Sequence, residues 1–128
     1  MKTVIIMGST SDQPHAKKIT DKLDEYGIAW TQHAASAHKQ PLKVLEILTV
    51  NKDEKDIVYI TIAGRSNALS GFVAANCEFP TIGCPPFADK TDMLVNIHST
   101  LQMQSNTPVL TILDPGNCAL AVKRIFGV

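Results

Sequence analysis

The sequence predicts an α/β fold built on a parallel sheet. Short apolar runs rich in β-branched residues, such as Ile57–Ile62, alternate with segments whose apolar residues recur every three or four positions. This alternation of strand and helix is typical of right-handed crossover units. A chain of 128 residues accommodates several such units in one domain. We therefore expect a single-domain three-layer sandwich of the flavodoxin-like type, with a five-stranded parallel sheet in the order 2-1-3-4-5.

The first two crossover units reach to about residue 51. Val4–Met7 is a continuous apolar run, as expected of a strand that is covered on both faces. A helix is expected from Gln13, with proline in its first turn, to a stop at Gly27. Ile28–Ala34 predicts the second strand, and a second helix follows from Pro41 to about Asn51. The apolar positions expected to pack in these two helices are Ala16, Ile19, Leu23 and Tyr26, and then Leu42, Leu45 and Leu48.

The second half of the chain repeats this pattern. Ile57–Ile62 is the clearest strand, a helix over about 68–77 follows, and a short strand over 80–84 stops at two prolines. The next helix is expected to carry Met93 or Leu94, Ile97 and Leu101. Residues 108–113 predict a fifth strand. The last helix, over 116–126, is expected to pack through Leu120, Val122 and Ile125 or Phe126.

Charge and composition exclude several classes of protein. Lysine plus arginine and aspartate plus glutamate both number 12, so the formal net charge is zero. A nucleic-acid-binding surface needs clustered positive charge, and no nucleic-acid partner is expected. The apolar runs are much shorter than the roughly 20 residues of a transmembrane helix, and no membrane partner is expected. The apolar N-terminus has no small-residue cleavage site, and we interpret it as a strand rather than as a signal peptide.

The three cysteines, Cys77, Cys84 and Cys118, have no Cys-x-x-Cys spacing. An odd number without this spacing indicates neither a disulfide framework nor a zinc site. We therefore expect reduced thiols, a cytoplasmic location and no metal. Cys84 is expected to be a buried small residue rather than a nucleophile, because no base stands near it in the sequence. His15 is expected on the surface of its helix.

Three turns of small and polar residues follow the first three strands. They are Gly8–Asp12, Ser36–Lys39 and Ala63–Asn67. In the expected strand order the first and third strands meet at the topological switch point, so all three turns face one crevice. Hydroxyls and backbone N–H groups at a helix start suit a phosphate, and a cationic side chain balances an anion. His38, in the middle turn, is a side chain type that carries protons near neutral pH.

Each of these residues also has an ordinary structural explanation. Ser11, Asp12 and Asn67 are residue types that cap helices. Arg65 on a loop is by default a solvated cation, and a turn histidine such as His38 is often only a solvated loop residue. The first turn is not a P-loop, because it lacks Gly-Lys-Ser/Thr. The prediction of a site therefore depends on the three turns lying together.

Together, Gly8-Ser9-Thr10-Ser11-Asp12, Ser36-Ala37-His38-Lys39 and Ala63-Gly64-Arg65-Ser66-Asn67 resemble the signature of the aminoimidazole ribonucleotide (AIR) carboxylase family of purine biosynthesis. The similarity runs in the same order over nearly the whole chain. The resemblance implies AIR and carbon dioxide as small-molecule substrates, no cofactor and His38 as the catalytic residue. The substrate-binding residues that it implies, with their neighbours in the turns, are Gly8, Ser9, Ser11, Asp12, Ser36, Ala37, Lys39, Ala63, Gly64, Arg65, Ser66 and Asn67.

The family has two branches. One adds carbon dioxide directly to carbon 4 of AIR, and the other, a mutase, rearranges N-carboxyaminoimidazole ribonucleotide. The mutase branch usually has arginine after the histidine of the middle turn and a further histidine in the third. This chain has Lys39, and residues 64–71 contain no histidine. It is similar to the direct carboxylase, as in the carboxylase part of the animal bifunctional enzyme, and the mutase is the alternative.

The resemblance also implies an assembly. Family members usually continue into C-terminal helices that embrace neighbouring subunits, whereas this chain stops at Val128. We therefore expect one domain over residues 1–128 without that extension. Because each site in the family is completed by neighbouring subunits, we expect a homo-oligomer, an octamer or a tetramer.

A non-catalytic flavodoxin-like binding module is the remaining alternative. A signalling receiver domain would have an aspartate at the end of the third strand, where Ala63 and Gly64 stand. A flavin-binding module would usually have aromatic residues in its turns, and the three turns contain none. Both features favour the enzyme.

Overall fold

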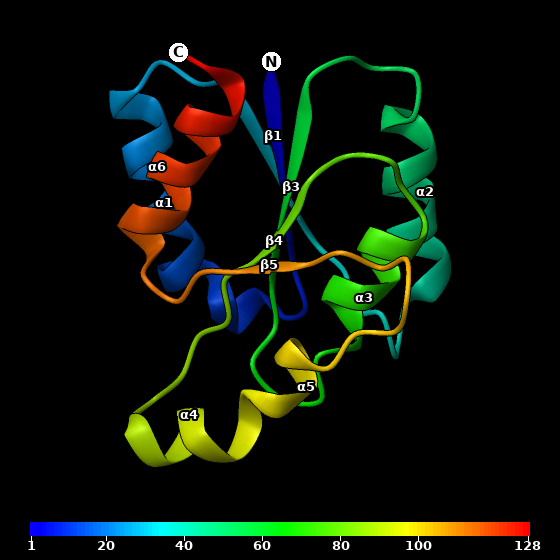
Figure 1. Ribbon diagram of the computed structural model, residues 1–128, viewed down its shortest axis with the longest axis vertical. Helices are drawn as coiled ribbons and strands as arrows, with labels where there is room; N and C mark the ends of the chain where they lie inside the picture. Colours follow the sequence, from blue (N-terminus) through cyan, green and yellow to red (C-terminus); the bar gives the residue numbers. More distant parts are fainter.

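The computed structural model describes residues 1–128 and shows a parallel sheet between two layers of helices (Figure 1). All neighbouring strands pair in parallel, in the order β2-β1-β3-β4-β5. The predicted fold and strand order are confirmed. The strands are β1 (Lys2–Met7), β2 (Trp30–Ala34), β3 (Ile57–Ile62), β4 (Thr81–Gly83) and β5 (Leu110–Thr111).

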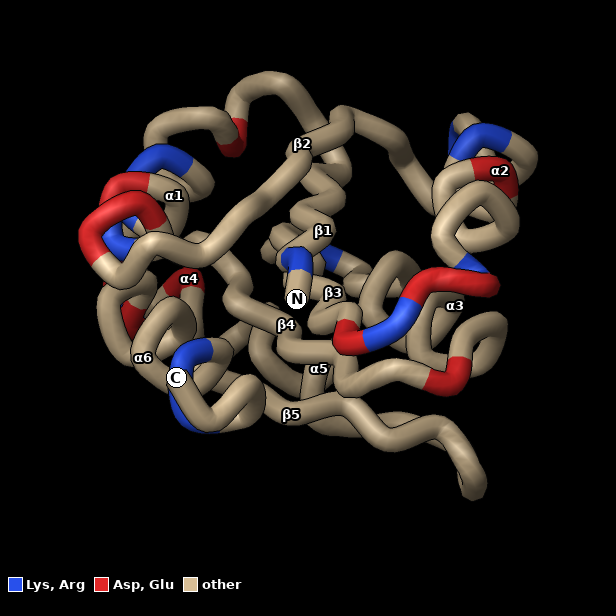
Figure 2. The backbone as a smooth tube through the Cα atoms, turned by 90° about the horizontal axis from the view of Figure 1, so that it is seen from above, with Lys and Arg blue, Asp and Glu red and all other residues tan.

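The helices cover both faces of the sheet and its carboxyl end. The larger ones are α1 (Gln13–Glu25), α2 (Pro41–Asn51), α3 (Ala68–Ala75) and α6 (Pro115–Phe126), with α1 and α6 on one face and α2 and α3 on the other (Figures 1 and 2). The smaller ones are the 3₁₀ helix η1 (Thr10–Asp12), α4 (Lys90–Asn96) and α5 (His98–Leu101). Figure 1 shows α4 and α5 beyond the carboxyl ends of the strands.

The central strands are apolar almost throughout because both of their faces are buried. In β1, Ile5 and Met7 pack in the layer of α1 and α6, whereas Val4 and Ile6 pack in the layer of α2 and α3. The same alternation continues in β3, whose side chains are all buried. The core is thus divided into two layers by the sheet, and the strand ends are left for the turns that follow them.

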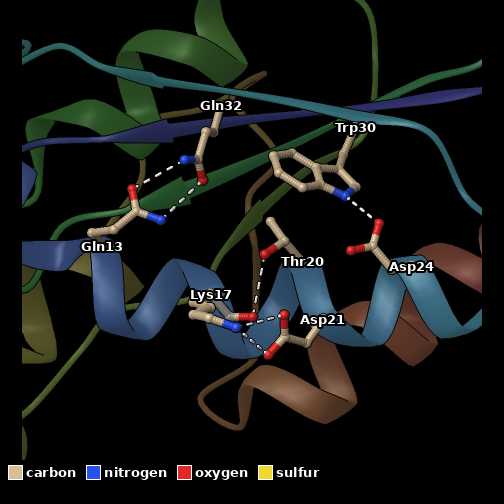
Figure 3. Close-up of polar contacts among 7 residues, drawn as sticks. All are labelled: Gln13, Lys17, Thr20, Asp21, Asp24, Trp30 and Gln32. Atoms are coloured by element: carbon tan, nitrogen blue, oxygen red, sulfur yellow. Dashed lines mark hydrogen bonds and ion pairs between the residues drawn. The ribbon is translucent and has the colours of Figure 1, made fainter.

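Helix α1 is held against the edge strand β2 by polar contacts (Figure 3). The amides of Gln13 and Gln32 bond reciprocally, at 3.3 and 3.0 Å, and the Trp30 indole N–H donates to Asp24 at 2.8 Å. The helix stops at Gly27, whose φ of +69° lies in the left-handed region that glycine adopts readily. The Gln13–Gln32 pair thus holds the start of α1, where the first of the three turns ends, and the bond from Trp30 to Asp24 holds its last turn. Its predicted core positions Ala16, Ile19 and Leu23 are buried.

The prediction of the buried residues of α2 is confirmed for Leu48 and wrong for Leu42 and Leu45. Leu42 is 79% exposed and Leu45 is 40% exposed, while the buried residues include Val44, Ile47 and Leu48. Two apolar stripes with helical spacing run along this helix, and periodicity alone does not show which one meets the sheet.

The helix predicted around 93–101 is in fact two short helices, α4 and α5, separated at Ile97. Leu94 and Leu101 are exposed rather than packed, because this segment lies beyond the sheet. The fifth strand is also shorter than predicted, and only Leu110–Thr111 pairs with β4. In α6 the predicted Val122 is buried, and of the two alternatives Ile125 and Phe126 it is Phe126 that packs against the core, whereas Ile125 is exposed.

Charge is spread over the surface. Figure 2 shows Lys and Arg positions beside Asp and Glu positions along α1 and α2. None of the helices is both long enough and apolar enough to cross a membrane.

Candidate functional site

A pocket of about 190 Å³ lies where the three turns meet at the carboxyl ends of β1, β2 and β3. The structure thus brings the three predicted turns together. Of the predicted site residues, only Ser11, Lys39 and Asn67 lie outside its lining. The lining residues are Gly8, Ser9, Asp12, Ser36, Ala37, His38, Ala63, Gly64, Arg65, Ser66, Ala68 and Leu69.

The first turn contains one carboxylate that does not cap a helix. Ser9 caps η1, and its hydroxyl accepts from the Ser11 N–H at 3.2 Å and lies 2.9 Å from the Ser11 hydroxyl. Asp12 precedes α1, yet its side chain makes no capping hydrogen bond. Burial raises the pKa of the Asp12 carboxyl, and the nearby His15 partly opposes this effect. Asp12 is therefore available to accept hydrogen bonds from a ligand, whereas Ser11 acts on the pocket only through Ser9.

The middle turn is closed by its own serine. The Ser36 carbonyl accepts from the Gln40 N–H at 2.7 Å, and the Ser36 hydroxyl accepts from the Lys39 N–H at 3.2 Å. None of the hydrogen bonds within this turn uses the His38 imidazole. His38 is exposed and lines the pocket, whereas Lys39 does not line it. The turn therefore presents an imidazole to a ligand without a competing partner in the turn.

The third turn is tightly packed on one side. A Cβ on Gly64 would lie 2.7 Å from the Pro86 carbonyl oxygen, so only glycine fits there. Ser66 has a φ of +46°, in the left-handed region. Between them Arg65 is exposed and lines the pocket, with its Nη2 atom 3.9 Å from Asp92 Oδ1. The turn thus places one cation at the edge of the pocket.

Asn67 is a helix cap, which is the structural explanation that the sequence offered beside a role in binding. Its Oδ1 accepts from the Ser70 N–H at 3.1 Å and so caps α3. Its Nδ2 donates to the Ser70 hydroxyl at 2.8 Å and to the Thr100 hydroxyl at 2.9 Å. The Asn67 side chain is buried, and these hydrogen bonds use both its oxygen and its nitrogen. It therefore stabilises the third turn and does not line the pocket.

A second group of reactive side chains lies outside the pocket, in the layer of α1 and α6. Cys84 and Cys118 are buried together in the layer of α1 and α6, as expected for Cys84. His15 is half-buried rather than on the surface, and its Nε2 atom lies 3.0 Å from the Cys84 carbonyl oxygen. Because these residues are far apart in the chain, no motif in the sequence predicts that they lie together. All three cysteines are free thiols.

No group of three or more His, Cys, Asp or Glu side chains is arranged to hold a metal ion. The polar groups of the pocket are instead one carboxylate, one imidazole, one guanidinium and several hydroxyls. This set suits an anionic ligand that carries hydroxyl groups. The fold and the pocket thus define the class of the protein, which is a flavodoxin-like α/β protein with a polar pocket at the switch point of its sheet.

Comparison with known proteins identifies the family. The family model described as AIR carboxylase matches residues 2–128. The chain therefore belongs to the AIR carboxylase family, which is a family of enzymes, and the resemblance of the three turns is confirmed.

Individual relatives agree with this assignment. A phosphoribosylaminoimidazole carboxylase of Archaeoglobus fulgidus is 48% identical over 128 residues, which are 100% of this chain and 70% of the relative. A bifunctional phosphoribosylaminoimidazole carboxylase/phosphoribosylaminoimidazole succinocarboxamide synthetase of Homo sapiens is 34% identical over 99% of this chain and 30% of the relative. The crystal structure of Treponema denticola PurE has a TM-score of 0.91 and 42% identity, and the match covers 98% of this chain and 80% of that one.

Proposed function

We propose that the protein reversibly adds carbon dioxide to carbon 4 of AIR, which gives 4-carboxy-5-aminoimidazole ribonucleotide in purine biosynthesis. The observation that carries this proposal is the meeting of Asp12, His38 and Arg65 at one pocket in a chain of the AIR carboxylase family. The named relatives described above support the same reaction.

The first and third turns bind the nucleotide in this proposal. The Ser9 hydroxyl and the backbone at the start of α1 receive the phosphate, because N–H groups at a helix start are free to donate. The Asp12 carboxylate accepts hydrogen bonds from ribose hydroxyls. Arg65 offers several N–H donors to an anionic group, which is either the phosphate or the new carboxylate.

The middle turn carries the proton. The amino group of AIR pushes electrons into the imidazole ring, so carbon 4 attacks the carbon of carbon dioxide, and one C=O electron pair moves to oxygen. Carbon 4 then still holds its hydrogen, which the neutral His38 imidazole removes so that the ring becomes aromatic again. In the reverse direction the imidazolium returns this proton and carbon dioxide leaves. The forward step is thus a carboxylation that consumes no ATP.

The direct carboxylase is favoured over the mutase because residues 64–71 contain no histidine. Two assays of the purified protein, both followed by product absorbance, test this choice. The first mixture contains AIR and bicarbonate, and the second contains N-carboxyaminoimidazole ribonucleotide and a carbon dioxide scavenger. We expect turnover in the first mixture and little in the second. Efficient rearrangement in the presence of the scavenger would assign the protein to the mutase branch.

We further propose that the active form is a homo-oligomer. A pocket of about 190 Å³ is smaller than the roughly 300–1,000 Å³ of typical small-molecule sites, so one chain alone encloses a nucleotide poorly. A neighbouring copy of the chain would complete the enclosure. Sedimentation velocity on the active protein tests this proposal, and an active monomer at micromolar concentration would contradict it.

Two smaller assignments accompany this function. All five strands belong to one sheet, which supports a single domain over residues 1–128. The three free cysteines, two of them buried, fit a reducing compartment such as the cytoplasm.

A further inference from the structure

The third turn of the pocket is attached to the segment that contains α4 and α5, residues 89–101, which we call the α4–α5 segment. The Asn67 backbone N–H donates to the Ser99 hydroxyl at 2.9 Å, and the Asn67 side-chain amide donates to the Thr100 hydroxyl at 2.9 Å. Asn67 and Thr100 are buried, so the bond between their side chains does not compete with water. The base of the third turn is therefore fixed to α5.

The same segment presents a fixed carboxylate to Arg65. Asp92 Oδ2 accepts from the Ala88 N–H at 2.9 Å, and Asp92 Oδ1 accepts from the Asn96 side-chain amide at 2.7 Å. The hydrogen bond from Ala88 holds the pKa of the Asp92 carboxyl below its usual value, so this group is ionised at neutral pH. The Asp92 side chain is 19% exposed, whereas that of Arg65 is 82% exposed. The well-oriented Asp92 carboxylate thus lies beside the exposed guanidinium of Arg65.

The distance between the two groups leaves the guanidinium free to bind a ligand. Arg65 Nη2 lies 3.9 Å from Asp92 Oδ1, which is an ion pair but too long for a hydrogen bond. The attraction limits where the guanidinium sits, and its N–H donors stay available. Asp92 is the one ion-pair partner of Arg65 in the structure.

We propose that Asp92 is a positioning residue, which keeps the Arg65 guanidinium at the edge of the pocket, and that the α4–α5 segment holds the third turn for this purpose. The proposal rests on the proposed function, because it takes Arg65 to bind an anionic group of the nucleotide. Asp92 itself does not line the pocket. Its removal therefore weakens substrate binding without changing the chemical step.

Steady-state kinetics with AIR and bicarbonate test the proposal on the full chain. We expect Asp92→Asn to raise the KM for AIR about twofold to fivefold, the range expected of one exposed ion pair, with little change in kcat. The matched control is Asp89→Ala, which removes the cap of the same helix, because the Asp89 carboxylate accepts from the Asp92 N–H at 2.8 Å. It is expected to lower Tm as much as Asp92→Asn but to leave KM near the wild-type value. Asp92→Glu keeps the charge and is expected to restore most of the affinity.

A double-mutant cycle with Arg65→Gln distinguishes positioning from a general structural effect. We expect Arg65→Gln to raise KM more than Asp92→Asn does, and Asp92→Asn to add nothing further in the Arg65→Gln background. Equal KM values for Asp92→Asn and Asp89→Ala, or fully additive effects in the cycle, would overturn the positioning role while leaving the proposed function intact. If Arg65→Gln alone leaves KM unchanged, the assignment of Arg65 to the substrate is wrong, and the positioning role fails with it.

Discussion

The Nε2 atom of His15 lies 3.0 Å from the carbonyl oxygen of Cys84 and 3.5 Å from its sulfur. This contact joins α1 to the end of β4 across 69 positions of sequence. The Cys118 thiol, by hydrogen bonding to Cys84, lowers the pKa of the Cys84 thiol to about 6, and His15 adds to this effect against the opposing effect of burial. Conversely, the hydrogen bond to Cys84 and burial raise the pKa of the Cys118 thiol. The pair therefore shares one proton over the neutral range.

This arrangement predicts one thiolate in the folded protein at pH 7. Thiolate absorbance at 240 nm should titrate with a midpoint near 6, well below the ordinary thiol value of 9.0. Cys84→Ser should remove this transition. Cys118→Ala should move it to higher pH, because the donor that stabilises the thiolate is lost. A titration unchanged by Cys118→Ala would contradict the shared proton.

Asp12→Asn should separate stability from binding. Because burial raises the pKa of Asp12, the ionised carboxylate costs folding free energy at neutral pH, and the neutral amide does not. The variant should therefore have a higher Tm than the wild type at pH 7. As the pH falls below 3.8, the ordinary Asp value, the carboxyl is protonated in both states and the difference should vanish. Binding of AIR should weaken, because the carboxylate no longer accepts from the ribose hydroxyls.

Calorimetry across pH together with a binding titration checks both halves of the Asp12 prediction. A variant that is less stable than the wild type at pH 7 would mean that the carboxylate has a stabilising partner. A variant with unchanged affinity for AIR would remove Asp12 from the binding site.

Gly64→Ala should destabilise the protein, whereas Gly8→Ala should have a much smaller effect. A Cβ at Gly64 would lie 2.7 Å from the Pro86 carbonyl oxygen, and backbone cannot move aside cheaply. The expected loss is about 1–3 kcal/mol, the usual cost of overpacking. At Gly8 the nearest atom, the Ile62 carbonyl oxygen, is 3.6 Å away, which is an ordinary contact. Urea unfolding of both variants measures the difference, and equal stabilities would show that the third turn is not packed as described.

The sequence predicted the order of the strands and the meeting of the three turns, because both follow from local patterns combined with the topology of parallel sheets. Crossover units place successive strand ends at one edge, and small polar residues at those ends are visible in the sequence. The faces of the helices were less predictable. Leu42 and Val44 both belong to apolar stripes, and only packing against the sheet buries Val44 rather than Leu42.

The contacts that refine the site could not be predicted, because they join distant parts of the chain. Asn67 has the same residue type whether it caps a helix or binds a sugar, and only the position of Thr100 shows that its amide is occupied. His15 and Cys84 come together only after β4 is placed beside β3. Asp92 likewise reaches Arg65 through a segment that the sequence predicted as one longer helix.

The most direct test of the account is the rate of carboxylation by His38→Asn, measured at saturating AIR and bicarbonate. If His38 moves the proton at carbon 4, this variant should keep its fold and most of its affinity for AIR while kcat falls about 10²–10⁴-fold, the usual contribution of one general acid/base. His38 is exposed and the hydrogen bonds of its turn do not use the imidazole, so the substitution should leave Tm unchanged. A kcat close to that of the wild type, in a folded variant, would show that His38 is only a residue of the turn and that the proposed chemistry is wrong.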